Sequence, residues 1–251
     1  MALTIRLRVK TSIPVEVDSI RMEEVRTKSA DEVAATLVHY GNKQVPLSEF
    51  FDVEGSAADD AEIVWEGDCS HVKLIGATLA SGKIRVEGNS GMHLGAEMTG
   101  GEIVVSGNSG DWVGAEMHGG RIHVRGNAGH LVGAVYRGGH RGMTGGEIII
   151  DGDAGNEIGH AMRRGLIAVG GRSGDSPGVS MIAGTILLFG QTGIRPGPSM
   201  RRGTIVMFDG KSAPEMIPTF RATGVCQPTF MRLYLQHLKS RNFALPDSAL
   251  E

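Results

Sequence analysis

The sequence predicts a mainly β fold: a single-domain solenoid with 19-residue coils, an N-terminal α/β cap and a C-terminal helix. Two observations predict the solenoid. The pattern G-x-I-x-V-x-G-x-x-G-x-x-x-G-x-x-M recurs along the chain, and apolar residues alternate between its glycines. Five of the six intervals between repeats are 19 residues and one is 26, so one unit is copied with a single insertion. The repeats start at Gly82, Gly101, Gly120, Gly146, Gly165, Gly184 and Gly203.

A glycine-rich unit of this length favours short strands over helices. Helix-pair repeats need more than about 30 residues, and each glycine inside a helix costs about 1 kcal/mol. Ile84 and Val86, then Ile103 and Val105, are apolar at period two, as half-buried strands require. Each unit is therefore predicted to form one turn of a β-solenoid. Seven turns stacked about 4.8 Å apart give a rod about 30 Å long.

Two other columns of the repeat are interpreted as structural. Asn89, Asn108 and Asn127 recur at one corner, where stacked amides can hydrogen-bond along the rod. A methionine column shares the parity of the inward residues, so these flexible thioethers are predicted to fill a narrow interior. Its members are Met98, Met117, Met143, Met162, Met181 and Met200.

The segments that flank the repeats are predicted to close the rod. Residues 1–60 form the cap, with strand-like runs and a helix-like stretch from Ser29 to His39 that begins at a Ser29/Glu32 capping box. Residues 61–210 carry the repeats, with the insertion near 137–143. Residues 211–251 form a tail with a helix at about 229–241. The apolar residues expected to dock this helix are Phe230, Leu233, Tyr234, His237 and Leu238.

An apolar stripe is expected on the outside of the later coils. The outward columns are mostly polar in the early coils and become apolar further along the chain. Such a stripe needs a cover, which the tail helix, a partner subunit or both could supply. The stripe consists of Ile149, Leu187, Phe189, Val206 and Phe208.

Composition is typical of a soluble, cytoplasmic protein. The 251 residues carry a formal net charge of −3, and no apolar run approaches the about 18 residues of a membrane span. The N-terminal residues lack the apolar core of a secretory signal. Cys69 and Cys226 stand alone without C-x-x-C spacing, so neither a disulfide framework nor a zinc site is expected.

Catalytic motifs are not found. The sequence holds no G-x-G-x-x-G, and its histidines form no H-x-H or H-E-x-x-H pair. Glu97 and Glu116 share an outward column, as paired carboxylates or as salt-bridged surface acids. We predict no catalytic residue and no metal site.

Charge is polarised along the rod. Residues 1–120 hold 10 Lys/Arg and 19 Asp/Glu, whereas residues 121–232 hold 13 and 7. Basic side chains recur in matching columns and in the insertion, which suits a polyanionic ligand or an acidic partner surface; a solvated basic face is the alternative. Nucleic acid is not expected, because the net charge is negative and aromatic residues are 5%. The candidate binding residues are Arg137, His140, Arg141, Arg163, Arg164, Arg201 and Arg202.

Repeats such as GGEIVVSGNSGDWVGAEMHGG resemble the glycine-repeat β-helix domain at the end of the large glutamate synthase subunit. With the cap segment VPLSEFFDVEG, residues 45–55, the chain more closely resembles the C subunit of formylmethanofuran dehydrogenase and its counterpart in the bacterial formyltransferase/hydrolase complex. The resemblance spans nearly the whole chain. It implies a right-handed parallel β-helix.

The resemblance also implies a function. The expected role is a non-catalytic scaffold in a formyltransferase/hydrolase complex that moves and hydrolyses formyl groups on a methanofuran-like carrier. One alternative is the C subunit of a molybdenum or tungsten formylmethanofuran dehydrogenase. Another, from a different class, is a structural β-helix domain in an amidotransferase assembly of the glutamate synthase type.

Partners and cofactors follow from the same resemblance. The expected partners are an amidohydrolase-like subunit, which holds zinc, a formyltransferase subunit and a further subunit, with no nucleic acid and no membrane. This chain alone is expected to bind no cofactor. Because carriers of this class bear a glutamate-rich tail, the candidate arginines are expected to guide that tail.

Overall fold

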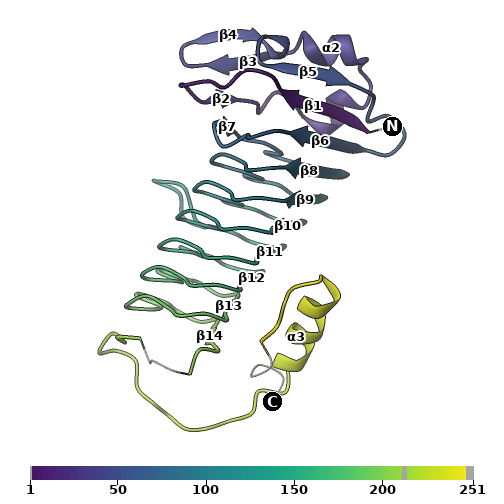
Figure 1. The fold of residues 1–251 in the computed structure, drawn as a ribbon. Helices are drawn as coiled ribbons and strands as arrows, with labels where there is room; N and C mark the ends of the chain where they lie inside the picture. Colours follow the sequence, from purple (N-terminus) through teal and green to yellow (C-terminus); the bar gives the residue numbers. More distant parts are fainter. Residues whose placement is uncertain (1, 211–213, 247–251) are drawn as a thin grey trace.

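The computed structural model describes residues 2–210 and 214–246 and shows a rod of stacked coils (Figure 1). One ten-stranded sheet runs the length of the rod, in the order β14-β13-β12-β11-β10-β9-β8-β6-β1-β5. The coil strands are β6 (Glu62–Glu66), β8 (Lys83–Glu87), β9 (Glu102–Val105), β10 (Arg121–Val124), β11 (Glu147–Ile150), β12 (Leu166–Val169), β13 (Thr185–Leu188) and β14 (Thr204–Met207). The predicted mainly β solenoid with an N-terminal cap and a C-terminal helix is confirmed.

Equivalent residues of successive coils lie directly above one another. Ile84 pairs with Ile103, and Ile103 with Ile122, in parallel ladders. The rod begins one coil before the glycine pattern, because β6 pairs with β8 although Ala61, at φ +51°, stands where later coils have glycine. The repeat pattern therefore understates the rod by one coil.

The interior is narrow and fully packed. Ile103, Ile122 and Met117 are 0% exposed, and five of the six methionines of the predicted column are fully buried, while Met200 in the last coil is partly buried. Gly95 shows why one corner requires glycine: its φ is +62°, and a Cβ there would lie 2.5 Å from the Cδ1 of Ile122. The glycine columns thus let the coils turn against a core that has no room for another methyl group.

The asparagine corner is a hydrogen-bonded ladder. The Asn89 side-chain oxygen accepts from the backbone N–H of Asn108 at 2.9 Å, and the Asn108 oxygen accepts from Asn127 at 2.8 Å. The side chains thus bond to the backbone of the next coil rather than to each other's amides. The ladder satisfies N–H groups that the corner takes out of the strand ladder.

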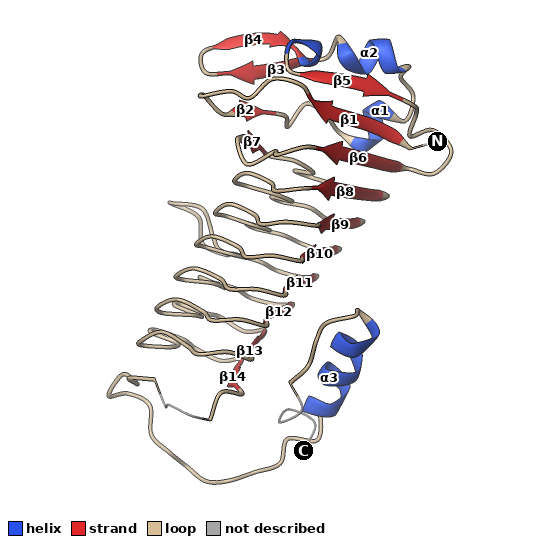
Figure 2. Cartoon of the chain, in the orientation of Figure 1, coloured by secondary structure: helices blue, strands red, loops and turns tan. Residues whose placement is uncertain are grey.

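The cap covers the N-terminal end of the rod (Figure 2). Its elements are β1 (Leu3–Leu7), β2 (Val15–Glu16), α1 (Met22–Val25), α2 (Ala30–Ala34), β3 (Leu37–Tyr40), β4 (Lys43–Pro46), a 3-10 turn η1 (Leu47–Glu49) and β5 (Phe51–Glu54). Strand β2 pairs with β7 (Val72–Lys73) of the first coil and so joins the cap to the rod. The predicted Ser29/Glu32 capping box is present. The helix expected from Ser29 to His39 stops at Ala34, because Leu37–Tyr40 pairs with β2 and β4 as a strand.

The C-terminal helix α3 (Met231–Ser240) folds back along the outside of the rod (Figure 1). Met231, Leu235 and Leu238 face the rod and are buried, whereas Leu233 is 69% exposed. The expectation that Leu233 and Phe230 dock the helix on the rod was therefore wrong, because Phe230 is also 45% exposed. Within the described residues, no helix is long and apolar enough to cross a membrane.

Candidate functional site

The outer stripe and α3 form one cluster. Ile149, Leu187 and Phe189 are buried with the rod-facing residues of α3, and Val206 and Phe208 pack against the same cluster. Phe189 stacks on Phe208 with ring centroids 4.4 Å apart. The structure therefore places all five stripe residues under or beside the helix.

The insertion between β10 and β11 is held on the rod by Tyr136. Its ring stacks on the ring of Trp112 with the centroids 5.0 Å apart, and its hydroxyl lies 3.0 Å from Nδ1 of His93. The backbone N–H of Tyr136 donates to the Glu116 carboxylate at 2.9 Å. Burial lowers the pKa of His93 and raises the pKa of Tyr136 to about 12, so both groups are neutral at pH 7.

This arrangement corrects the expectation for the Glu97 and Glu116 column. Within the described residues neither carboxylate forms a salt bridge. Glu116 instead accepts the backbone bond that starts the inserted loop. The residues that anchor the loop lie 20 or more positions before Tyr136 in the sequence. The one sequence signal for this contact was Trp112, a large aromatic residue in a corner column of the repeat.

Beside the loop, the rod carries three adjoining depressions with shared walls. The first is lined by Glu116, His118 and Thr144 together with His140 and Arg141 of the loop, and the second and third continue along the next coils. We call this surface the basic trough. Its lining arginines are Arg141, Arg163, Arg164, Arg201 and Arg202, and its lining histidines are His118, His140 and His160.

The repeat itself aligns the trough arginines. The Arg163 N–H donates to Met143 O at 2.8 Å, and the Arg201 N–H donates to Met181 O at 2.9 Å, so both occupy the same place in their coils. Six of the seven predicted binding residues thus come together. Arg137 is exposed on the loop but lines none of the three depressions.

The trough arginines have no ion-pair partner within the described part of the chain. None of Arg141, Arg163, Arg164, Arg201 and Arg202 forms an ion pair with a described carboxylate, while Arg121 and Arg125 elsewhere on the rod do. Unpaired guanidinium groups set side by side raise the local positive potential and attract anions. Planar guanidinium groups also pair well with carboxylates and phosphates.

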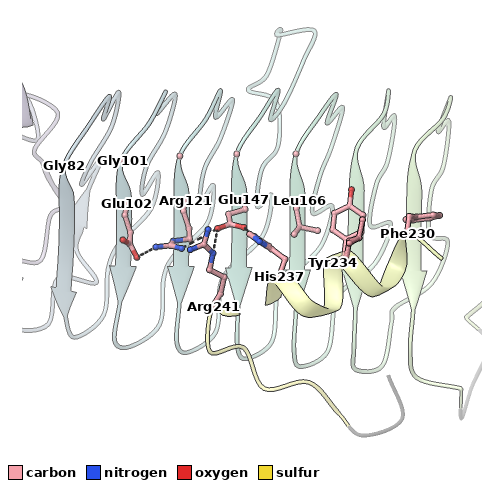
Figure 3. Close-up of a pocket in the computed structure, with 14 residues that line it drawn as sticks. Gly82, Gly101, Glu102, Arg121, Glu147, Leu166, Phe230, Tyr234, His237 and Arg241 are labelled. Atoms are coloured by element: carbon pink, nitrogen blue, oxygen red, sulfur yellow. Dashed lines mark hydrogen bonds and ion pairs between the residues drawn. The ribbon is translucent and has the colours of Figure 1, made fainter. Parts of the chain in front are cut away.

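A second polar feature, not foreseen from the sequence, lies beside α3 (Figure 3). Arg121 bridges Glu102 at 2.6 Å and Glu147 at 3.8 Å along the rod. Glu147 also contacts His237. Its carboxylate lies 3.3 Å from Nε of Arg241, which is an ion pair without a hydrogen bond. The alternating charges at the first position of successive strands were the available signal.

A buried polar pair lies near the C-terminal end of α3. His123 is 4% exposed, and its Nε2 lies 2.8 Å from a carboxylate oxygen of Asp151. Burial alone raises the pKa of Asp151, but the bonds and charges of His123 and Arg125 outweigh it and hold that pKa below its usual value. The pair is a structural feature of the rod and faces the C-terminal segment through Arg125 and Asn242.

Among the described residues, no group of three or more His, Cys, Asp or Glu side chains could hold a metal ion. Cys69 is buried, which raises its pKa to about 12, and Cys226 is exposed. The described chain thus carries a surface lined by basic side chains and an apolar stripe covered by α3.

Comparison with known proteins identifies the family. No family model matches the chain. The fold matches a chain in the X-ray crystal structure of the formyltransferase/hydrolase complex (FhcABCD) from Methylorubrum extorquens in complex with methylofuran. The TM-score is 0.85 and the identity 32%, over 98% of this chain and 89% of that chain.

Curated relatives match over shorter segments. The C subunit of tungsten-containing formylmethanofuran dehydrogenase 2 from Methanococcus maripaludis is 38% identical over 92 residues, which are 37% of this chain and 34% of the relative. The C subunit of molybdenum-containing formylmethanofuran dehydrogenase 1 from Methanosarcina barkeri is 42% identical over 85 residues, 33% of this chain and 28% of the relative. The match thus spans about a third of these curated relatives. Together with the nearly full-length structural match, these identities show that the chain belongs to the family formed by the C subunit of formylmethanofuran dehydrogenase and its counterpart in the formyltransferase/hydrolase complex.

Proposed function

We propose that this chain is a non-catalytic scaffold subunit of a formyltransferase/hydrolase complex that moves and hydrolyses formyl groups on a methanofuran-like carrier. The observation that carries the proposal is the match over 98% of the chain to a member of such a complex, which was crystallised with methylofuran. The use of polar side chains supports a scaffold role: Asn108, His123 and Glu147 are committed to contacts that hold the rod or its helix. The chemistry then belongs to partner subunits.

Three partner subunits are part of this proposal: an amidohydrolase-like subunit that holds zinc, a formyltransferase subunit and one further subunit. The test is gentle purification of the tagged chain from its native host, followed by mass spectrometry of the co-purifying proteins and metal analysis. We expect an amidohydrolase and a formyltransferase with zinc and without molybdenum or tungsten. A chain that purifies alone would contradict the scaffold role.

One alternative has its own support. The curated relatives with 38% and 42% identity are subunits of tungsten- and molybdenum-containing formylmethanofuran dehydrogenases. The same purification separates the two functions, because the dehydrogenase would bring molybdenum or tungsten and iron. We favour the formyltransferase/hydrolase complex because its match extends over almost the whole chain.

We further propose that the basic trough and Arg137 guide the acidic tail of the carrier. The support is the alignment of unpaired arginines over successive coils, which offers repeated carboxylate sites along one line. Reversing Arg163 and Arg164 to Glu should weaken carrier binding by about tenfold and reduce its salt dependence. Arg232→Glu is the control, because this exposed arginine lies on α3 outside the trough. Equal carrier affinity in both variants would overturn the proposed role.

A further inference from the structure

The C-terminal end of the rod is left open at strand β14. Coil strands β8–β13 each have a neighbour on both sides, whereas among the described residues β14 pairs only with β13. The interior residues record the difference: Ile186 and Leu188 of β13 are 0% exposed, but the equivalent Ile205 and Met207 are only partly buried. A solenoid needs a cover at each end to keep its core from water.

The free edge of β14 presents unused backbone groups. Thr204 and Phe208 donate to Gly184 O and Leu188 O at 3.0 and 2.8 Å, so these residues face β13. Because backbone groups alternate sides along a strand, the N–H and C=O of Ile205 and Met207 point to the open side. Among residues 2–210 and 214–246, no backbone group pairs with them. Such an edge is a template for an added strand.

The described part of the connecting arm, residues 214–230, contacts this end of the rod near Arg195 and Gly197. Glu215 O accepts from the Arg195 N–H at 2.8 Å, and the Phe220 ring lies against Gly197. The arm then leaves the rod before α3 returns along the outer face (Figure 1). It leaves Ile194, Met216 and Phe220 each more than 40% exposed near the Arg195 corner of the last coil.

Charge indicates what kind of segment fits. Four exposed arginines, Arg195, Arg201, Arg202 and Arg221, lie near this end against two described carboxylates, Asp209 and Glu215, so the end is net basic. None of the four arginines has an ion-pair partner among the described residues. A second copy that paired β14 with β14 would bring the same positive charges to the same edge. A second copy that bound head-to-tail would leave a further free end and build an open filament. The edge is therefore complementary to an acidic segment of a different protein.

We propose that another protein of the complex completes the rod by adding an extended, acidic segment as a further strand on the free edge of β14. This inference rests on the proposed membership of a multi-subunit complex. The segment would bond to the backbone of Ile205 and Met207 and cover the exposed apolar residues of the last coil. The C-terminal end of the rod would then be an interface between subunits.

Residue-resolved hydrogen exchange tests the proposal on the full chain alone and on the complex purified from the native host. We expect the amides of Ile205 and Met207 to exchange at least about tenfold more slowly in the complex. The amide of Val206, which faces β13, is the internal reference. Equal exchange of Ile205 and Met207 in both samples, in a complex that is intact, would overturn the inference and leave the scaffold role standing.

A pair of variants tests the backbone bond directly. Met207→Pro removes the outward N–H and blocks an incoming carbonyl, while Met207→Ala removes the same side chain and keeps the N–H. We expect Met207→Pro to lower the fraction of chain recovered with partner subunits by at least about tenfold relative to Met207→Ala. If the chain alone dimerises with these amides protected, the occupant is a second copy and the inference is wrong. If no complex forms with the wild-type chain, the proposed function fails as well.

Discussion

Helix α3 should detach from the rod when one rod-facing side chain is shortened. Leu238 is 0% exposed and lies in the cluster with Ile149 and Phe189, so Leu238→Ala removes buried methyl groups and leaves a cavity. Such a change costs about 2–5 kcal/mol. Because each 1.4 kcal/mol is a factor of ten, the opening equilibrium of the helix should rise by about 30- to 5000-fold.

Hydrogen exchange of the α3 amides measures this opening equilibrium. Leu233→Ala is the matched control, since it makes the same chemical change in the same helix at a position that is 69% exposed. We expect the control to change the opening free energy by no more than about 0.5 kcal/mol. Equal loss of protection in the two variants would refute the reasoning, because it would mean that helix propensity rather than packing holds α3.

Three further changes have defined outcomes. Gly114→Ala should unfold about 2–12 °C below Gly138→Ala in a thermal melt, because both glycines have positive φ but only at Gly114 would a Cβ press on the core; equal melting temperatures would contradict this. The lowered pKa of Asp151 predicts stability that is present above pH about 4 and lost as pH falls below it, so Asp151→Asn should flatten the acid side of the melting-temperature profile. Of the two thiols, Cys226 should react with a thiol reagent in the native protein and Cys69 should react only after unfolding; fast labelling of both would show that the first coil opens.

The sequence was sufficient for the solenoid because one short-range rule repeats. Each coil needs glycine where the chain turns against the core and alternating apolar residues between those turns, and the structure has both at the predicted columns. Gly95 and Met117 illustrate this: one must lack a side chain and the other must fill the interior. The glycine columns begin only at Gly82, because Ala61 replaces the glycine of the first coil, although the predicted repeat region 61–210 includes that coil.

The local sequence pattern predicted secondary structure and docking faces less well where contacts between distant segments determine them. Leu37–Tyr40 continues an apolar run from α2, but it forms a strand because β2 and β4 lie on either side of it. The tail helix carries apolar residues on two adjacent stripes, and periodicity alone selected the stripe with Leu233 instead of the one with Leu235. Only docking on the rod distinguishes them.

By itself, the sequence determined the stacked coils, the inward columns and the line of basic residues, because all three follow from a period that copies the same environment every 19 residues. The tertiary structure alone decided how Tyr136 binds the inserted loop to Trp112 and His93, which face of α3 meets the rod, and that the edge of β14 is left free. These contacts join segments whose spacing follows no repeat. Their free energy comes from burial and hydrogen bonds between distant parts of the chain, which no local pattern encodes.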